Sequence, residues 1–281
     1  WKISVKMFDG TNWVNVGPDG FSDGRVYWCQ LDFTSSGEPV VAFRDEYRNS
    51  KPSVMKFDGT NWNYVNSGVD KDFKGVAYGN NLFVEVGKSG KIFTSSNGAS
   101  WANTNVSTTS SPRLNSIYFG NNTFVGVGAS GNIVRSTDNG SSWDNATSPT
   151  ANHLLGVTFG NNTFVGVGFN GNIVRSTDNG TTWDNATSPT AKLLYGVGLG
   201  NNTFVAVGDS GNIVRSTDNG TTWDNATSPT ASNLFGVNFG NNTFVGVGNN
   251  GNIVRSTDNG SSWDNVTSST GNWVWGVTFL Q

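Results

Sequence analysis

The stretch STDNGTTWDNATSPT occupies Ser176–Thr190 and recurs without change at Ser216–Thr230. Closely related versions begin at Ser136 and Ser256, so the same unit starts every 40 residues. A constant period of this length is typical of repeat architectures, in which each copy is one supersecondary unit. Residues 154–193 and 194–233 agree at 32 of 40 positions. The repeat is therefore read first as a structural unit, and the few differences between copies become informative about function.

A tryptophan in a DGTNW or NGxxW pattern marks seven units along the chain. Their spacings are 49, 39, 42, 40, 40 and 40 residues, and the markers are Trp13, Trp62, Trp101, Trp143, Trp183, Trp223 and Trp263. No stretch places apolar residues at helical spacing, and the short apolar runs alternate and are interrupted by Gly and Asn. This pattern favours a ring of β-sheets over a helical solenoid.

One unit reads as four short strands, at 154–160, 163–168, 172–177 and 182–187, joined by tight turns. Four such strands predict one antiparallel sheet with two faces to bury, which a sheet of this size cannot do alone. Copies stacked face to face around an axis bury both faces. We expect an all-β chain in which residues 1–281 form a single seven-bladed β-propeller of four-stranded antiparallel blades.

The repeated stretch contains the pattern Ser-x-Asp-x-Gly-x-x-Trp, which predicts a hairpin turn. The Asp is expected to accept backbone N–H bonds within its own turn, and the Gly to supply a positive φ. The Trp is expected to pack across the hairpin into the neighbouring blade. We assign this structural role to Asp138, Asp178, Asp218 and Asp258 and to Trp143, Trp183, Trp223 and Trp263.

With these motifs, residues 73–281 resemble the Asp-box (BNR-repeat) β-propellers, a group that includes sialidases, xyloglucanases, the sortilin ectodomain and photosystem II assembly factors. The resemblance implies that the Asp-box hairpin is structural and lies away from the ligand face. It also implies a secreted or cell-surface protein, although no signal peptide is visible in this chain. One unit departs from the pattern, because TSSNGASW puts Ser96 where Asp is expected.

Residues 1–70 differ from the rest and contain VKMFDGTNWVNVG and VMKFDGTNWNYVN, 49 residues apart. They resemble a second blade type that is common in large secreted bacterial surface proteins. Asp9-Gly10 and Asp58-Gly59 are two-residue hairpin signals. Residues 1–16 supply only a third and an outer strand, and residues 273–279 supply an innermost strand. We therefore expect a closing blade built from both termini, with three strands.

The composition argues against several classes of function. The net charge is −3 and no block of like charges occurs, which is unlike a nucleic-acid-binding protein. Cys29 and His153 are the only residues of their types, so we expect neither a disulfide within the chain nor a metal site. No apolar run approaches the ~20 residues that span a bilayer. We expect no cofactor and a monomeric chain.

The differences between near-identical copies fall in the predicted turn between second and third strands and in the interblade loop. Strand order places both on one face of the disc, opposite the Ser-x-Asp-x-Gly-x-x-Trp turns. The inner strands start at this face, so aromatic residues at their start should surround the channel mouth. The candidate ligand-binding residues are Tyr195, Phe235, Trp273 and Trp275, with Asp209 and Asn249 as polar partners. Ordinary packing between inner strands is the alternative reading of these aromatics.

Three functional hypotheses remain open. The first is a non-catalytic binding module for a glycan or a protein surface, with the aromatic mouth as its site. The second is a scaffold without a ligand, either a natural spacer or an engineered or amplified array. The third is a sialidase-like glycoside hydrolase, which would need two facing carboxylates and an arginine cluster that the sequence does not show. The first is the preferred hypothesis, and it predicts that the protein is not an enzyme.

Overall fold

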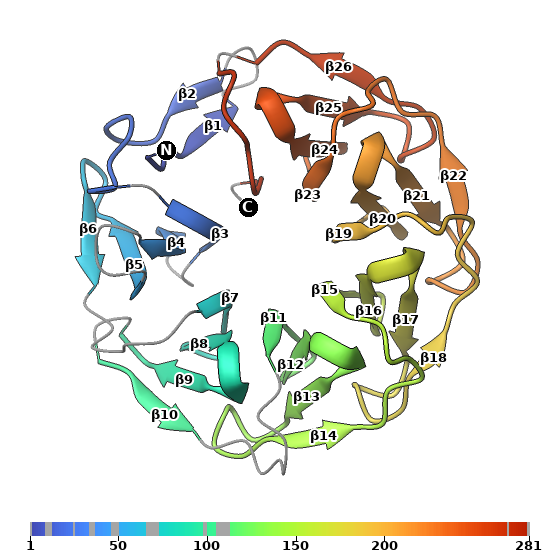
Figure 1. Cartoon of the computed structure of the whole chain (residues 1–281). Helices are drawn as coiled ribbons and strands as arrows, with labels where there is room; N and C mark the ends of the chain where they lie inside the picture. The colour runs from blue at the N-terminus through green and yellow to red at the C-terminus, as the bar shows by residue number, and fades with distance from the viewer. Residues whose placement is uncertain are drawn as a thin grey trace.

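The computed structural model describes residues 2–8, 13–24, 26–33, 37–45, 51–65, 73–97, 100–104, 113–268 and 270–279. Regular structure in these residues consists of β-strands and short 3-10 turns. The strands that are described form six four-stranded antiparallel sheets and one two-stranded sheet. Figure 1 shows these sheets arranged radially around a common axis. The chain is therefore a β-propeller.

Each four-stranded sheet is a blade, and the six are named A to F in chain order. Blade A comprises β3 (Val26–Phe33), β4 (Pro39–Asp45), β5 (Lys51–Phe57) and β6 (Trp62–Val65). Blade B comprises β7 (Phe73–Gly79), β8 (Leu82–Gly87), β9 (Ile92–Ser95) and β10 (Ala102–Thr104). Blade C comprises β11 (Leu114–Gly120), β12 (Thr123–Gly128), β13 (Ile133–Ser136) and β14 (Asp144–Ala146).

The remaining three blades repeat the same plan. Blade D comprises β15 (Leu154–Gly160), β16 (Thr163–Gly168), β17 (Ile173–Ser176) and β18 (Asp184–Asn185). Blade E comprises β19 (Leu194–Gly200), β20 (Thr203–Gly208), β21 (Ile213–Ser216) and β22 (Asp224–Ala226). Blade F comprises β23 (Leu234–Gly240), β24 (Thr243–Gly248), β25 (Ile253–Ser256) and β26 (Asp264–Val266). These strands match the four predicted for residues 154–187.

Five 3-10 turns join the second and third strands of blades B to F. They are η1 (Lys88–Gly90), η2 (Ala129–Gly131), η3 (Phe169–Gly171), η4 (Asp209–Gly211) and η5 (Asn249–Gly251). Each turn contains a left-handed Ser or Asn, such as Asn170 at φ 57°.

The prediction of seven blades with a three-stranded closing blade is wrong. The remaining sheet has only two strands, β1 (Lys6–Phe8) and β2 (Trp13–Asn15). Residues 273–279 form no strand and instead follow blade F, where the Val274 N–H donates to the Gly248 carbonyl over 2.9 Å. No described segment supplies a strand between residues 273–279 and β1, so the hydrogen-bond ladder is interrupted there (Figure 1).

The hydrophobic core lies between blades rather than within them. One cluster joins Val125, Val127 and Ile133 of blade C to Leu154, Phe164 and Trp183 of blade D. Equivalent clusters occupy the next two junctions. Phe164 is completely buried, and Trp183 is 6% exposed. A fully buried side chain of this size contributes about 1.5–3 kcal/mol, so each blade depends on its neighbour for stability.

The Ser-x-Asp-x-Gly-x-x-Trp turn, written below as the SxDxGxxW turn, has the predicted internal hydrogen bonds. Asp178 Oδ1 accepts the N–H groups of Thr181 and Thr182 at 3.0 and 2.9 Å. Gly180 has φ +79°, the left-handed region that favours glycine. The indole of Trp183 donates to the Gly180 carbonyl over 3.0 Å. The turn is thus held together by hydrogen bonds from side chains that are identical in the four copies of the motif.

The same turn also ties adjacent blades together. Arg135 of blade C donates to the Thr181 hydroxyl over 2.7 Å, and Arg175 of blade D donates to the Asn219 carbonyl over 3.1 Å. Asn219 in turn donates to the Thr163 hydroxyl over 2.6 Å. Arg135 and Arg175 therefore connect adjacent blades rather than forming a cluster that could hold a substrate carboxylate.

The divergent copies reach similar turns with other residues. In blade B, Asn97 rather than Ser96 takes the role of the Asp, because its Oδ1 accepts the Ser100 N–H over 2.9 Å. The predicted Asp58-Gly59 turn is confirmed: Asp58 accepts the Asn61 N–H over 2.7 Å, and Gly59 has φ +97°. The Asp9-Gly10 turn lies outside the described residues.

Asp178→Ala is expected to lower the free energy of unfolding by about 1–2 kcal/mol, because hydrogen bonds to a charged but exposed acceptor are lost. Urea denaturation measures the change, with Asp184→Ala on the outer strand of the same blade as a control. The hydrogen bonds from Thr182 and Ser176 outweigh the opposing effect of burial and lower the pKa of Asp178 to about 2. Its stabilising effect is therefore expected to be lost as the pH falls from 3.8 towards 2. Equal stability of the two variants would contradict the assigned role.

Blade B contains one buried acid with an unusual position. Glu85 of β8 stands where the other copies have Gly126, Gly166, Ala206 and Gly246. It is 1% exposed, and its carboxylate has no hydrogen-bond partner among the described residues. Burial raises the pKa of Glu85 to about 8 because the charged form would lose its hydration. The folded protein therefore holds this side chain neutral at moderately acidic pH.

The free energy of unfolding is expected to fall as the pH rises from about 4.5 to about 8. The reason is that the folded state keeps the Glu85 proton while the unfolded state releases it. Glu85→Gln should flatten this dependence, measured as the thermal midpoint at several pH values. Glu38→Gln, at an exposed acid paired with Lys56, is the control. A dependence that survives in Glu85→Gln would assign it to another group.

Candidate functional site

The innermost strands of blades B to F line a central cavity of about 1090 Å³. The inner strands of blades D, E and F lie close to the next inner segment because each carries a glycine at the point of contact. A Cβ on Gly156 would lie 2.8 Å from the Tyr195 carbonyl oxygen, and one on Gly196 would lie 2.7 Å from that of Phe235. These backbone contacts therefore fix the positions of the inner strands. The side chains next to the glycines determine which chemical groups face the cavity.

Four aromatic side chains gather at one mouth of this cavity, and they are called the aromatic rim. Phe235 stacks on Trp275 with ring centroids 4.4 Å apart, and Tyr195 meets Phe235 edge-on at 5.3 Å. Trp273 lies 5.6 Å from both Phe235 and Trp275. Tyr195, Phe235 and Trp275 line the cavity, whereas Trp273 packs beside them and is 54% exposed. The predicted aromatic residues are thus brought together.

The two predicted polar partners differ in their placement. Asp209 begins η4 and lies against Tyr195, where burial, then a hydrogen bond with Asp209 and the charge of that carboxylate, raise the pKa of Tyr195 to about 12. Asn249 begins η5, and its N–H donates to the Asn233 carbonyl over 2.9 Å. Neither residue lines the cavity. Asp209 thus acts on the rim through Tyr195, and Asn249 lies outside it.

The structure adds residues at this mouth that the sequence reasoning did not select. Phe169 begins η3, lines the cavity and is 39% exposed. His153 meets its ring edge-on at 5.0 Å, and His153 Nδ1 accepts the Ser130 N–H over 2.8 Å. Phe169 occupies the same turn position as Asp209. The residue at this position differs between copies, and this variation could have identified Phe169 from the sequence.

Basic side chains also line the cavity. Lys74 and Arg113 belong to its wall, and Arg113 Nε donates to Asn115 Oδ1 over 2.9 Å. Lys74 and Asn115 occupy the inner-strand position that Tyr195 occupies in blade E. One side of the mouth is therefore aromatic with a nearby carboxylate, and another side carries positive charge.

Hydrogen bonds confirm the predicted arrangement of the two faces. On the cavity-mouth face, turn η3 contacts the preceding interblade loop, since the Phe169 N–H donates to the His153 carbonyl over 2.9 Å. On the opposite face, Asn179 of one SxDxGxxW turn donates to the Thr123 hydroxyl of the preceding blade over 2.5 Å. The aromatic rim is therefore separated from the repeated turns by the thickness of the disc.

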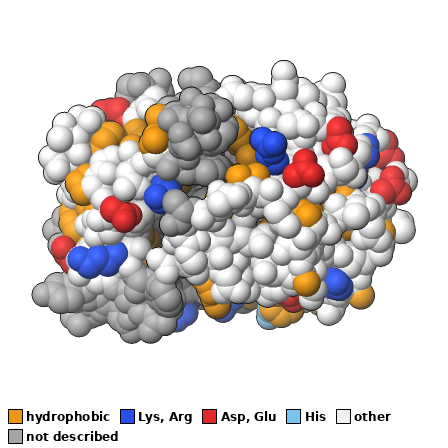
Figure 2. All heavy atoms as spheres, turned by 90° about the horizontal axis from the view of Figure 1, so that it is seen from above, with side chains coloured by type: hydrophobic (Ala, Val, Ile, Leu, Met, Phe, Trp, Pro, Cys, Tyr) orange, Lys and Arg blue, Asp and Glu red, His pale blue; other side chains and the backbone are white. Residues whose placement is uncertain are grey.

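Figure 2 gives one view of the edge of the disc. Figure 2 shows Lys, Arg, Asp and Glu scattered over the described part of that surface. The residues described contain no group of three His, Cys, Asp or Glu side chains that could hold a metal ion. They also contain no helix long and apolar enough to cross a membrane.

Comparison with known proteins supports the fold. A family model described as the DUF6242 beta propeller domain matches residues 56–194, slightly less than half of the chain. No curated protein matches the sequence. The predicted Asp-box family is not confirmed by these comparisons, whereas the propeller architecture is.

Three solved structures share this architecture at low sequence identity. YCF48 bound to D1 peptide has a TM-score of 0.70 at 16% identity, with 93% of this chain and 86% of that chain covered. YCF48 from Cyanidioschyzon merolae has a TM-score of 0.68 at 13% identity, with 91% and 89% covered. The computationally designed Ika8 protein has a TM-score of 0.72 at 13% identity, with 98% and 84% covered. At these identities the likeness establishes the fold alone.

Asp209→Asn is expected to lower the pKa of Tyr195 from about 12 towards its ordinary value of 10.0, because the negative charge beside the phenol is removed. Alkaline titration of tyrosinate absorbance measures the shift, and Tyr195→Phe identifies which part of the curve belongs to Tyr195. Asp224→Asn on the outer strand of the same blade is the control. Superimposable curves for wild type and Asp209→Asn would show that the carboxylate does not act on Tyr195.

Proposed function

We propose that this chain is a non-catalytic binding module that holds a polypeptide segment against the aromatic rim. The observation that carries the proposal is the gathering of Tyr195, Phe235, Trp273 and Trp275 at one mouth of the cavity, with Trp273 54% exposed. A cluster of aromatic side chains that opens onto a cavity is typical of a site that binds a partner.

Aromatic residues suit this role for energetic reasons. Tyr and Trp bury a large area with few rotatable bonds, and they dominate the residues on which protein–protein affinity depends. The contacts among the four rings hold them in place before a partner arrives, which reduces the entropy lost on binding. Asp209 beside Tyr195 and the basic Lys74 and Arg113 of the wall can then orient the partner.

The composition of the cavity favours binding over catalysis. None of the described residues that line it is Asp, Glu, His or Cys. Hydrolysis of a glycosidic bond uses two carboxyl groups on either side of that bond, and Asp209 is a single carboxylate outside the wall. This arrangement gives no support to the sialidase-like hypothesis.

Of the two ligand classes predicted from the sequence, the comparisons support a protein partner. One similar structure is YCF48 bound to D1 peptide, so a propeller of this kind can hold a polypeptide. At 16% identity, the extension of peptide binding to this chain is our proposal. Glycan binding gains no comparable support.

Selection of a random-sequence phage-displayed peptide library on the immobilised protein tests the proposal. Peptides that bind wild type are expected to lose about 2 kcal/mol, roughly 30-fold in Kd, on Trp273→Ala or Phe235→Ala. Val14→Ala, which truncates an exposed apolar side chain in β2, should bind as wild type does. Circular dichroism and the thermal midpoint establish that each variant is folded. Failure to obtain any peptide that depends on the rim would overturn the proposal.

A further inference from the structure

Differences between the near-identical blades follow a pattern along the inner strand. The three copies read LLGVTFG at 154–160, LYGVGLG at 194–200 and LFGVNFG at 234–240. The first, third, fourth and seventh letters are the same in every copy, whereas the second and fifth differ in all three. Two separate positions of the same strand therefore vary within an otherwise constant sequence.

Contact between strands explains why the other positions stay constant. A Cβ on Gly160 would lie 1.8 Å from the Leu199 side chain, and one on Gly236 would lie 2.9 Å from the Trp275 carbonyl oxygen. Leu154 and Leu194 are completely buried. The second and fifth positions line the cavity in all three copies, and so do the constant third and fourth positions; the variable lining residues are Leu155, Tyr195, Phe235, Thr158, Gly198 and Asn238. The variation therefore follows the cavity inwards and is not confined to its mouth.

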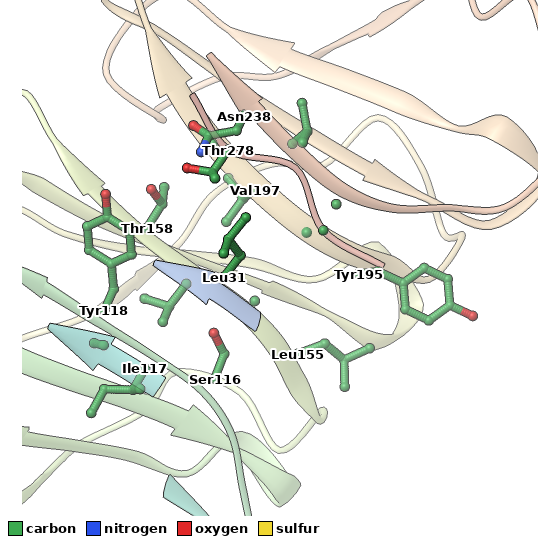
Figure 3. Close-up of a pocket in the computed structure, with 18 of the residues that line it drawn as sticks. Leu31, Ser116, Ile117, Tyr118, Leu155, Thr158, Tyr195, Val197, Asn238 and Thr278 are labelled. Atoms are coloured by element: carbon green, nitrogen blue, oxygen red, sulfur yellow. The ribbon is translucent and has the colours of Figure 1, made fainter. Parts of the chain in front are cut away.

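Polar side chains at four of the fifth positions form a second layer, which is called the polar ring; the fifth positions of blades B and E, Ala77 and Gly198, line the cavity without a polar side chain. Its members are Tyr118, Thr158, Asn238 and Thr278, all of which line the cavity. Figure 3 shows them on the side of the cavity away from Leu155 and Tyr195. Three residues of a strand separate the layers, which is roughly 10 Å at ~3.3 Å per residue.

The chemistry of the polar ring differs from that of the aromatic rim. It presents three hydroxyl groups and one carboxamide, all uncharged. The Asn238 carboxamide donates to the Val277 carbonyl over 3.4 Å and accepts the Phe239 N–H over 2.8 Å, which leaves one N–H and one lone pair for a ligand. A charged group would leave water without gaining a counter-charge there, and a large apolar group would cover the hydroxyls without offering them a hydrogen bond. A peptide group or a Ser, Thr, Asn or Gln side chain both donates and accepts, and so fits this ring.

We propose that a polypeptide segment held at the aromatic rim continues into the cavity and that the polar ring binds its uncharged hydrogen-bonding groups. The inference rests on the proposed function and adds a specificity-determining site to it. The volume of about 1090 Å³ lies just above the range of small-ligand sites, which leaves room for a short length of extended chain. The groups differ around the ring: blade C presents a phenol, blade D and residues 273–279 present threonine hydroxyls, and blade F presents a carboxamide.

Two variants test the ring with the peptides selected on wild type. Tyr118→Phe removes one hydroxyl from a residue that is 38% exposed, and Asn238→Leu replaces the carboxamide by an apolar group of similar size. Each is expected to weaken binding about fivefold, the effect of one lost uncharged hydrogen bond. Asn265→Leu makes the same replacement on the outer strand of blade F and should leave the affinity unchanged.

A second selection asks for altered specificity rather than loss. Asn238→Asp places a negative charge in the ring, so the same library is expected to yield peptides enriched in Lys or Arg at one position. Peptides that depend on Trp273 and Phe235 but bind Tyr118→Phe and Asn238→Leu with unchanged affinity would overturn the polar ring and leave the proposed function intact. An Asn238→Asp selection that repeats the wild-type sequences would also overturn it. Absence of any rim-dependent peptide would overturn both proposals.

Discussion

Packing of each blade on the next is the interaction on which the rest of this structure depends. A single sheet of about 40 residues exposes two apolar faces, and only the adjacent sheets cover them. The completely buried Phe124, Phe164, Phe204 and Phe244 occupy equivalent places between blades. The SxDxGxxW turn adds polar ties across the same junctions, through Arg135 and Arg175. Because successive junctions are the same, each inner strand keeps a fixed position relative to the next one around the axis.

Because the junctions between blades are constant, the residues of the cavity wall can differ from blade to blade without a change in how the blades pack. The second and third strands are almost identical in the copies, because they face other blades on both sides. The inner strand has one edge without a strand partner in its own sheet, and its second and fifth residues both line the cavity. One strand of seven residues thus combines constant positions, which pack against neighbouring strands, with variable positions, which line the cavity.

Local patterns allowed much of the fold to be predicted. The repeat period, the strand lengths and the role of Asp178 and Gly180 all depend on contacts within one unit or with its immediate neighbour. The closure of the ring depends on contacts between distant residues, and so the conformation of residues 273–279 could not be inferred. The turn in blade B is one residue shorter, which hid the role of Asn97. The aromatic rim was predicted from the variation at the starts of the inner strands. The contact between Phe169 and His153 could not be predicted in this way, because both residues lie in connections outside those strands.

Repetition of the third strand has a consequence for how the chain folds. The sequence NIVRST is the same at 172–177 and 212–217, so β16 could form equivalent pairs with β17 or with β21. Side-chain chemistry cannot distinguish these partners. Only four residues, 169–172, separate β16 from its correct partner, whereas the wrong pairing would close a much longer loop at a greater entropic cost. Short connections, rather than the strands themselves, therefore determine which copies pair.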